Sequence, residues 1–325
     1  NCEHGGINES FAELYARTGD RRWLALALRL YHHKVLKPLE QERDELANIH
    51  ANTQIPKLIG LARLYEVHGQ DAHAKAANYF WRRVTQHHSY VIGGHGDREY
   101  FFEADTVAKH LTEQTCEACC SYNMLKLTRH LYSWQPDAAY FDYYERTHLN
   151  HILAHQDPAT GMFTYMTPLM AGVARAYSSE ENDFWCCVLS GMESHAKHGD
   201  SIYWHDKDSL LINLYIPSTL DWKQQGLQLE MQTAYPYQEE IVFRIQQASR
   251  RKKLNLAFRI PSWAKEYQIH VNDKPLTTQL EKNYLVVQRE WRKGDVIRLT
   301  LPMTLRMEKA QGSQDVAAIL RGPMV

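Results

Sequence analysis

The sequence predicts a helical domain followed by a β-sandwich, and three observations lead to this prediction. Up to about residue 204, apolar residues recur at steps of three and four, the period of amphipathic helices. From Ser209 onward, short β-branched or alternating runs are separated by Gly, Pro, Asn and Asp. The 325 residues suffice for two domains. We therefore expect a helical domain of residues 1–206 and a β domain of residues 207–325.

Five segments of the first domain carry a clear helical pattern. In the second of them, Trp23, Ala27, Leu30 and Tyr31 form one apolar face. The expected helices cover residues 8–15, 23–35, 56–67, 72–86 and 120–133.

A weak internal repeat organises these helices into pairs. A Leu-Tyr dipeptide is followed, four residues after the tyrosine, by a residue at which a helix should stop. Each copy reads as a helix, a tight turn and a second helix, which predicts a closed or curved stack of helix pairs. The three stops are Gly19, Gly69 and Pro136.

The second domain contains eight short runs typical of strands. Their close spacing and the turn residues between them predict a β-sandwich. The expected strands cover residues 210–216, 227–232, 241–245, 254–260, 268–271, 284–288, 296–301 and 316–320.

Charge and termini limit the functional classes. The chain has 37 Lys and Arg against 38 Asp and Glu, so nothing in its net charge favours nucleic acid or an anionic membrane as a partner. No apolar run reaches the roughly 18 residues of a membrane helix. The chain begins at Asn1 inside a helical pattern and ends just after a strand-like run, so we expect an excerpt of a longer protein. Its compartment is therefore left open.

The most informative feature is a pair of thiol clusters about seventy positions apart. Five of the six cysteines are Cys116, Cys119 and Cys120 in one stretch and Cys186 and Cys187 in the other. Thiols grouped in this way serve a metal, a redox couple or a nucleophile.

Metal binding has two forms in this pattern. Cys119, Cys186 and Cys187 with one carboxylate would make a tetrahedral zinc site, because zinc accepts sulfur and oxygen ligands. Alternatively, Cys116 could replace the carboxylate in a structural four-thiolate site that ties two loops together. Spacing alone does not choose between them.

The redox and nucleophile interpretations also have a basis in the sequence. Cys116 and Cys119 have the Cys-x-x-Cys spacing of redox motifs, but no thioredoxin-like βαβ pattern surrounds them. Disulfide bonds between the two clusters are an alternative if the protein is exported. A nucleophilic thiolate would need a partner acid. Glu99 offers one, in a Gly-rich loop over residues 92–102 where catalytic side chains often lie.

At these residues the sequence resembles the β-L-arabinofuranosidases of glycoside hydrolase family 127 and its relative, family 146. The motifs are long, ordered and spread over essentially the whole chain. The resemblance implies an (α/α)6-barrel-type helical toroid, partial here because its first helices would precede Asn1, followed by a β-sandwich. The matching segments are residues 2–9, 50–57, 117–119, 122–129, 184–187 and 195–203.

The resemblance also implies a zinc ion (Zn2+) as cofactor, held by one glutamate and three cysteines. Glu117 and Cys119 match the Glu-x-Cys pair of ligands, and Cys187 matches the third ligand. Cys186 matches the ligand that is also the nucleophile. Cys116 and Cys120 are extra thiols that this set of roles does not require.

The remaining roles implied by the resemblance concern the sugar. Glu99 matches the acid/base, His50 matches a histidine that lines the sugar pocket, and His4 is assigned to the same pocket. The expected reaction is retaining hydrolysis that releases L-arabinose, with the Cys186 thiolate in place of the usual second carboxylate.

The expected partner is therefore an L-arabinofuranose-containing glycan or oligosaccharide, with no nucleic acid and no membrane, and a homodimer is left open. Two alternatives stand beside this reading. One is a carbohydrate-binding or scaffold protein with a structural Cys-rich zinc site. The other is a hydrolase that acts on another glycoside.

Overall fold

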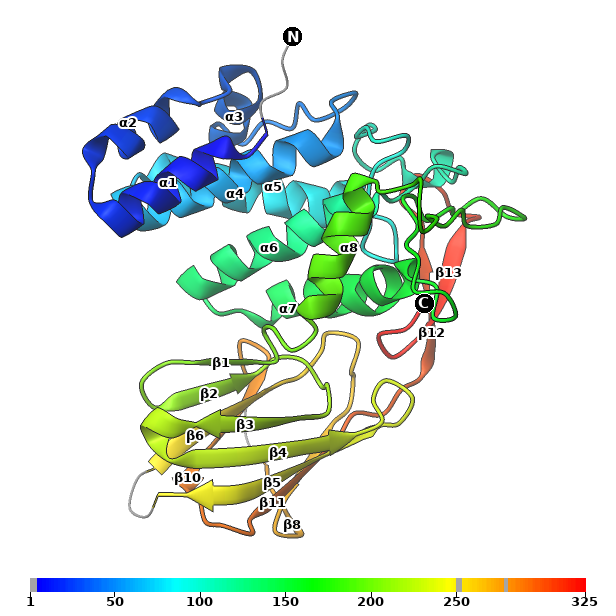
Figure 1. Cartoon of the computed structure of the whole chain (residues 1–325). Helices are drawn as coiled ribbons and strands as arrows, with labels where there is room; N and C mark the ends of the chain where they lie inside the picture. The colour runs from blue at the N-terminus through cyan, green and yellow to red at the C-terminus, as the bar shows by residue number, and fades with distance from the viewer. Residues whose placement is uncertain (1–4, 250–252, 278–279) are drawn as a thin grey trace.

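A layer of helices lies against a β-sandwich in the computed structural model of the chain (Figure 1). The structure describes residues 5–249, 253–277 and 280–325. Short π-helical turns follow two of the helices, at Val84–His88 and His148–Ile152. The helices are α1 (Ile7–Thr18), α2 (Arg21–Arg29), α3 (His33–Glu40), α4 (Ala51–His68), α5 (Asp71–Arg83), α6 (Ala118–Trp134), α7 (Ala138–Thr147) and α8 (Cys186–Ala196).

The expected helical hairpins are present. Gly19 and Gly69 end α1 and α4 in the left-handed conformation that glycine adopts at low cost, and α2 and α5 begin immediately after them. Asp137 caps α7 by accepting a hydrogen bond from the backbone of Ala139, just after Pro136 separates it from α6. Paired helices at these turns therefore confirm the internal repeat.

Two of the helix predictions were wrong in their bounds. The single helix expected over residues 23–35 is broken between Arg29 and His33, because α2 packs on α1 whereas α3 packs on α5. The helix expected from Pro56 begins at Ala51, so that its first turn reaches the functional site described below.

Two antiparallel-rich sheets form the sandwich within the described residues. One has the order β1 (Tyr203–His205), β2 (Ser209–Ile212), β6 (Lys253–Arg259), β10 (Tyr284–Glu290) and β9 (Leu280–Glu281), in which β2 and β6 are parallel. The other has the order β3 (Ser218–Trp222), β4 (Leu227–Thr233), β5 (Glu240–Ala248), β11 (Val296–Thr300), β7 (Gln268–Val271) and β8 (Lys274–Pro275). The alternating burial along β2, β4 and β11 reflects their one-sided packing on the core.

The last expected strand lies outside the sandwich. Residues 316–320 overlap β13 (Ala317–Arg321), which, within the described residues, pairs with β12 (Leu305–Lys309) in a separate two-stranded sheet. This hairpin lies beside the helical layer (Figure 1), to which Glu308 is joined by a bidentate ion pair with Arg146. The division of the chain at residues 206 and 207 itself stays a prediction.

A buried charged cluster joins the sandwich to the helices. Arg259 of β6 is fully buried and donates to Asp142 at 2.7 Å and to Glu145 at 2.6 Å, both on α7. Tyr235 donates to the same Glu145 carboxylate at 2.8 Å. Because a buried guanidinium is costly without its partners, these contacts fix the sandwich against α7.

In the described part of the chain, none of the helices is long and apolar enough to cross a membrane.

Candidate zinc and thiolate site

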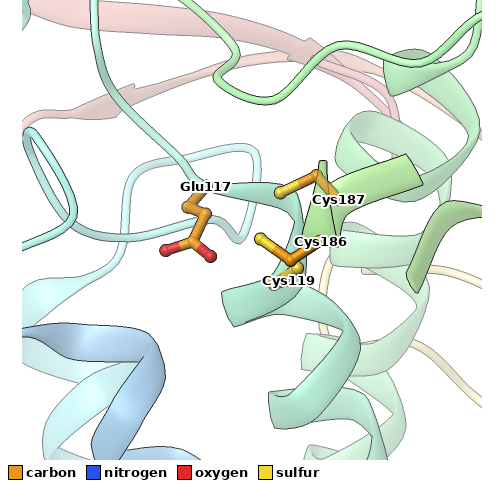
Figure 2. Close-up of side chains that lie close together, drawn as sticks. All are labelled: Glu117, Cys119, Cys186 and Cys187. Atoms are coloured by element: carbon orange, nitrogen blue, oxygen red, sulfur yellow. The ribbon is translucent and has the colours of Figure 1, made fainter. Parts of the chain in front are cut away.

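Three thiols and one carboxylate converge where α6 and α8 pack together. Glu117 is the N-cap residue of α6 and Cys119 lies in its first turn, while Cys186 and Cys187 begin α8. Figure 2 shows the four side chains pointing toward one another. Their ligand atoms all lie within 4.8 Å of one another. Residues about seventy positions apart in the sequence thus form one cluster, as the sequence predicts.

Both helices present their N-terminal ends to this cluster. Backbone N–H groups and the positive end of each helix dipole favour negative charge at such a position. Hydrogen bonds from Cys119 and Cys187 hold the pKa of Cys186 well below its usual range, and the same contacts raise the pKa of the other two thiols. The cluster therefore concentrates its negative charge on Cys186, the one thiol of the four residues that is exposed.

Glu117 lies in a different environment from Cys186. The residue is 2% exposed, and burial, followed by the nearby Cys186 charge, raises its pKa to about 8. Asn52 donates to its Oε1 at 3.0 Å, and the Cys120 thiol lies 3.6 Å from its Oε2. A bound cation would favour the ionised carboxylate, because it supplies the positive charge that this buried position lacks.

Glu99 lies on a strained turn next to the cluster. Asp97 and Tyr100 exchange two backbone hydrogen bonds, and the two residues between them have positive φ angles, 48° at Arg98 and 71° at Glu99. This is the geometry of a two-residue hairpin that favours Gly or Asn in both central positions. Backbone strain of this kind at non-glycine residues clusters at functional sites.

Tyr165 connects Glu99 to Cys186 and was missed by the sequence reasoning. Its hydroxyl donates to Glu99 Oε1 at 2.5 Å and lies 3.7 Å from Cys186 Sγ. The carboxylate oxygen and the sulfur are therefore at most about 6 Å apart, an upper limit that is compatible with the roughly 5–5.5 Å between the two carboxyl groups of retaining glycosidases. Burial and the Glu99 carboxylate raise the pKa of Tyr165, so its hydroxyl keeps its proton.

Of the two histidines assigned to the sugar pocket, the structure describes His50. His50 caps α4, accepting at Nδ1 from the backbone of Thr53, and its Nε2 lies 3.5 Å from Glu99 Oε2. His50 thus faces the acid/base candidate. His4 lies outside the described residues.

The extra thiols do not belong to the cluster. Cys116 is fully buried, and its sulfur packs against Gly94, where an added Cβ would lie 2.8 Å from it. Cys116 is not part of the group that could hold a metal, so the structure contradicts the four-thiolate arrangement. Cys120 is also fully buried, and the cysteines in the described part of the chain are free thiols.

Comparison with known families gives a direct match over most of the chain. Residues 1–200 match the family model described as beta-L-arabinofuranosidase, GH127 catalytic domain. Residues 209–303 match the GH127 middle domain of the same enzymes.

A curated relative and two solved structures extend this comparison. A non-reducing end beta-L-arabinofuranosidase of Bifidobacterium longum subsp. longum is 23% identical over 99% of this chain and 56% of its own length. The structure of a GH127 beta-arabinofuranosidase superposes with a TM-score of 0.84 at 23% identity, over 97% of this chain and 55% of that one. The structure of a GH127 beta-L-arabinofuranosidase from Geobacillus stearothermophilus T6 superposes with a TM-score of 0.79 at 21% identity, over 98% of this chain and 58% of that one.

These likenesses confirm the fold, an (α/α)-barrel-type helical domain followed by a β domain. The chain spans a little over half the length of the relatives that it matches.

Proposed function

This chain belongs to glycoside hydrolase family GH127, and on that footing we propose that it hydrolyses β-L-arabinofuranosides with Cys186 as nucleophile and Glu99 as acid/base. The observation that carries the proposal is the Tyr165 hydroxyl, which contacts both Glu99 and Cys186. An acid and a nucleophile at this separation can act on opposite sides of one glycosidic bond. The substrate is an L-arabinofuranose-containing glycan or oligosaccharide.

The donor set fits zinc as the cofactor. Glu117, Cys119, Cys186 and Cys187 offer one oxygen and three sulfurs within 4.8 Å, which suits the tetrahedral coordination and ligand preference of this metal. Zinc bound by these four groups would keep the thiols ionised and fix the direction of Cys186. Cys186 is exposed, so its sulfur is accessible to a substrate, and this favours a catalytic role over the scaffold alternative.

The first step forms a bond to sulfur. The Cys186 sulfur attacks the anomeric carbon while the Glu99 carboxyl gives its proton to the glycosidic oxygen, so the carbon–oxygen bond breaks and the leaving alcohol departs neutral. A thioglycosyl link joins the sugar to Cys186. Tyr165 holds Glu99 in place, since it donates to one carboxylate oxygen and leaves the other for the reacting proton.

The second step releases the sugar. The Glu99 carboxylate takes a proton from water, whose oxygen attacks the anomeric carbon and expels the sulfur. Two displacements at one carbon retain its configuration. His50 lies against Glu99 on the α4 side and is proposed, as is His4, to bind sugar hydroxyls.

Hydrolysis of an aryl β-L-arabinofuranoside tests the proposal. The unsubstituted protein and its Cys186→Ser variant are compared, and the zinc content of both is measured. We expect turnover in the first and its loss in a folded second protein. No turnover on this or related furanosides, with one tightly held zinc per chain, would support the structural-zinc alternative instead.

A further inference from the structure

Two asparagine side chains form a directed chain of hydrogen bonds that ends on Glu117. Asn123 of α6 donates through Nδ2 to Asn52 Oδ1 at 2.9 Å, and Asn52 of α4 donates through Nδ2 to Glu117 Oε1 at 3.0 Å. Because Asn123 and Glu117 both lie toward the N-terminal end of α6, this series of hydrogen bonds runs from α6 to α4 and back to α6. None of the roles assigned above uses either asparagine.

The direction of both amides follows from the carboxylate. In the zinc-bound site Glu117 is ionised and only accepts hydrogen bonds, so Asn52 must turn its NH2 group toward Glu117 and its carbonyl oxygen toward Asn123. The Asn123 NH2 group satisfies that carbonyl, which removes the alternative orientation of Asn52. A flipped Asn52 would place two oxygens against each other at this point.

The bond from Asn52 leaves Glu117 able to bind a cation. It uses one lone pair of Oε1, and a carboxylate offers about four such positions. In the described part of the chain, the Glu117 carboxylate is contacted by the neutral Asn52 amide and by the Cys120 thiol rather than by an Arg, Lys or His nitrogen. A neutral amide can thus orient the carboxylate without neutralising the charge that holds a metal.

From this geometry we infer that Asn52 is a positioning residue for the metal ligand Glu117, and that Asn123 supports Asn52. The inference rests on the zinc-bound site of the proposed function. Partners that orient a metal ligand typically contribute a factor of about 10 to 100 in metal affinity. Asn52→Ala should therefore weaken zinc binding by about tenfold to a hundredfold, and Asn123→Ala should weaken it less, because it acts one bond further away.

Zinc affinity measured by competition with a chelator tests the inference on the purified protein. Asn52→Ala and Asn123→Ala are compared with Asn78→Ala, which removes an amide that bonds Tyr140 between α5 and α7. The thiolate-to-metal absorption of the cobalt-loaded forms reports the ligand geometry. We expect weaker binding and an altered cobalt spectrum for Asn52→Ala, a smaller loss for Asn123→Ala, and neither for Asn78→Ala.

The outcomes separate this inference from the proposed function. Zinc affinity within threefold of the unsubstituted protein in both Asn52→Ala and Asn123→Ala, even with lower thermal stability, would overturn the positioning role and leave the glycosidase proposal intact. An equal loss in Asn78→Ala would also overturn it, because the effect would then be a general one on helix packing. An unsubstituted protein that binds no zinc would overturn both the zinc-bound site and the role of Asn52. If Asn52→Ala does not fold, Asn123→Ala alone decides.

Discussion

Replacing Tyr165 with phenylalanine should impair catalysis while leaving the fold and the metal site intact. The change removes one hydroxyl, which donates to Glu99 at 2.5 Å and contacts Cys186 Sγ at 3.7 Å. A hydrogen bond to a charged group contributes about 1.5–3 kcal/mol. At 1.36 kcal/mol per tenfold change in rate, its loss lowers kcat/KM by roughly tenfold to 150-fold, provided that the bond persists in the transition state. Steady-state hydrolysis of an aryl β-L-arabinofuranoside measures this change.

A matched control isolates the hydroxyl that matters. Tyr177 lies on the same long loop, is 37% exposed and pairs through its backbone with Thr164. Tyr177→Phe should leave kcat/KM within a factor of about two, because exposed substitutions away from special contacts have small effects. A Tyr165→Phe variant with full activity and normal zinc content would refute the reasoning, since the hydroxyl would then have no part in holding the acid/base beside the nucleophile.

Two further predictions concern stability. Arg259→Met should lower the free energy of unfolding by about 3–5 kcal/mol, because it leaves the buried Glu145 without its cation. Urea unfolding measures this change. A loss of stability below about 1 kcal/mol would contradict the role of this ion pair. Chelator-treated protein should also lose stability as the pH falls from about 6.5 toward 4, because the histidines of the unfolded chain bind protons that the buried histidines of the folded chain do not. The free energy of unfolding should fall by up to about 1.4 kcal/mol per pH unit for each buried neutral histidine. Burial lowers the pKa of these histidines, to about 3 for His95 and His151 and to about 4 for His148 and His155. Urea unfolding at several pH values checks it, and a flat profile over this range would show that these side chains accept protons in the folded state.

The fold was predictable where a period or a turn residue marks it. Gly19, Gly69 and Pro136 identified the helical hairpins, and each of the eight strand-like runs overlaps a strand, although the run over residues 210–216 does so only up to Ile212. Helix α8 was not predicted because Trp185 gives no side-chain cap and Gly191 lowers helix propensity within it. The break between α2 and α3 was also missed, because it depends on which neighbour each half packs against.

The site divides in a similar way. Cys119, Cys186 and Cys187 were visible because clustered thiols are rare in a sequence, and Glu117 was added by family resemblance. Tyr165 is one of the nineteen tyrosines of the chain. It lies in a loop without periodicity, and no local sequence pattern marks it. Its importance depends on the loop bringing its hydroxyl between Glu99 and Cys186, which is a tertiary contact.

The most direct test of the account is the mass of Cys186 during turnover. The protein is mixed with an aryl β-L-arabinofuranoside, quenched with acid in the steady state and digested, and the peptide that contains Cys186 is analysed by mass spectrometry. The account predicts one anhydropentose unit on Cys186, absent from Cys186→Ser. Turnover with no sugar on Cys186, or with sugar on another side chain, would contradict the thiolate as nucleophile.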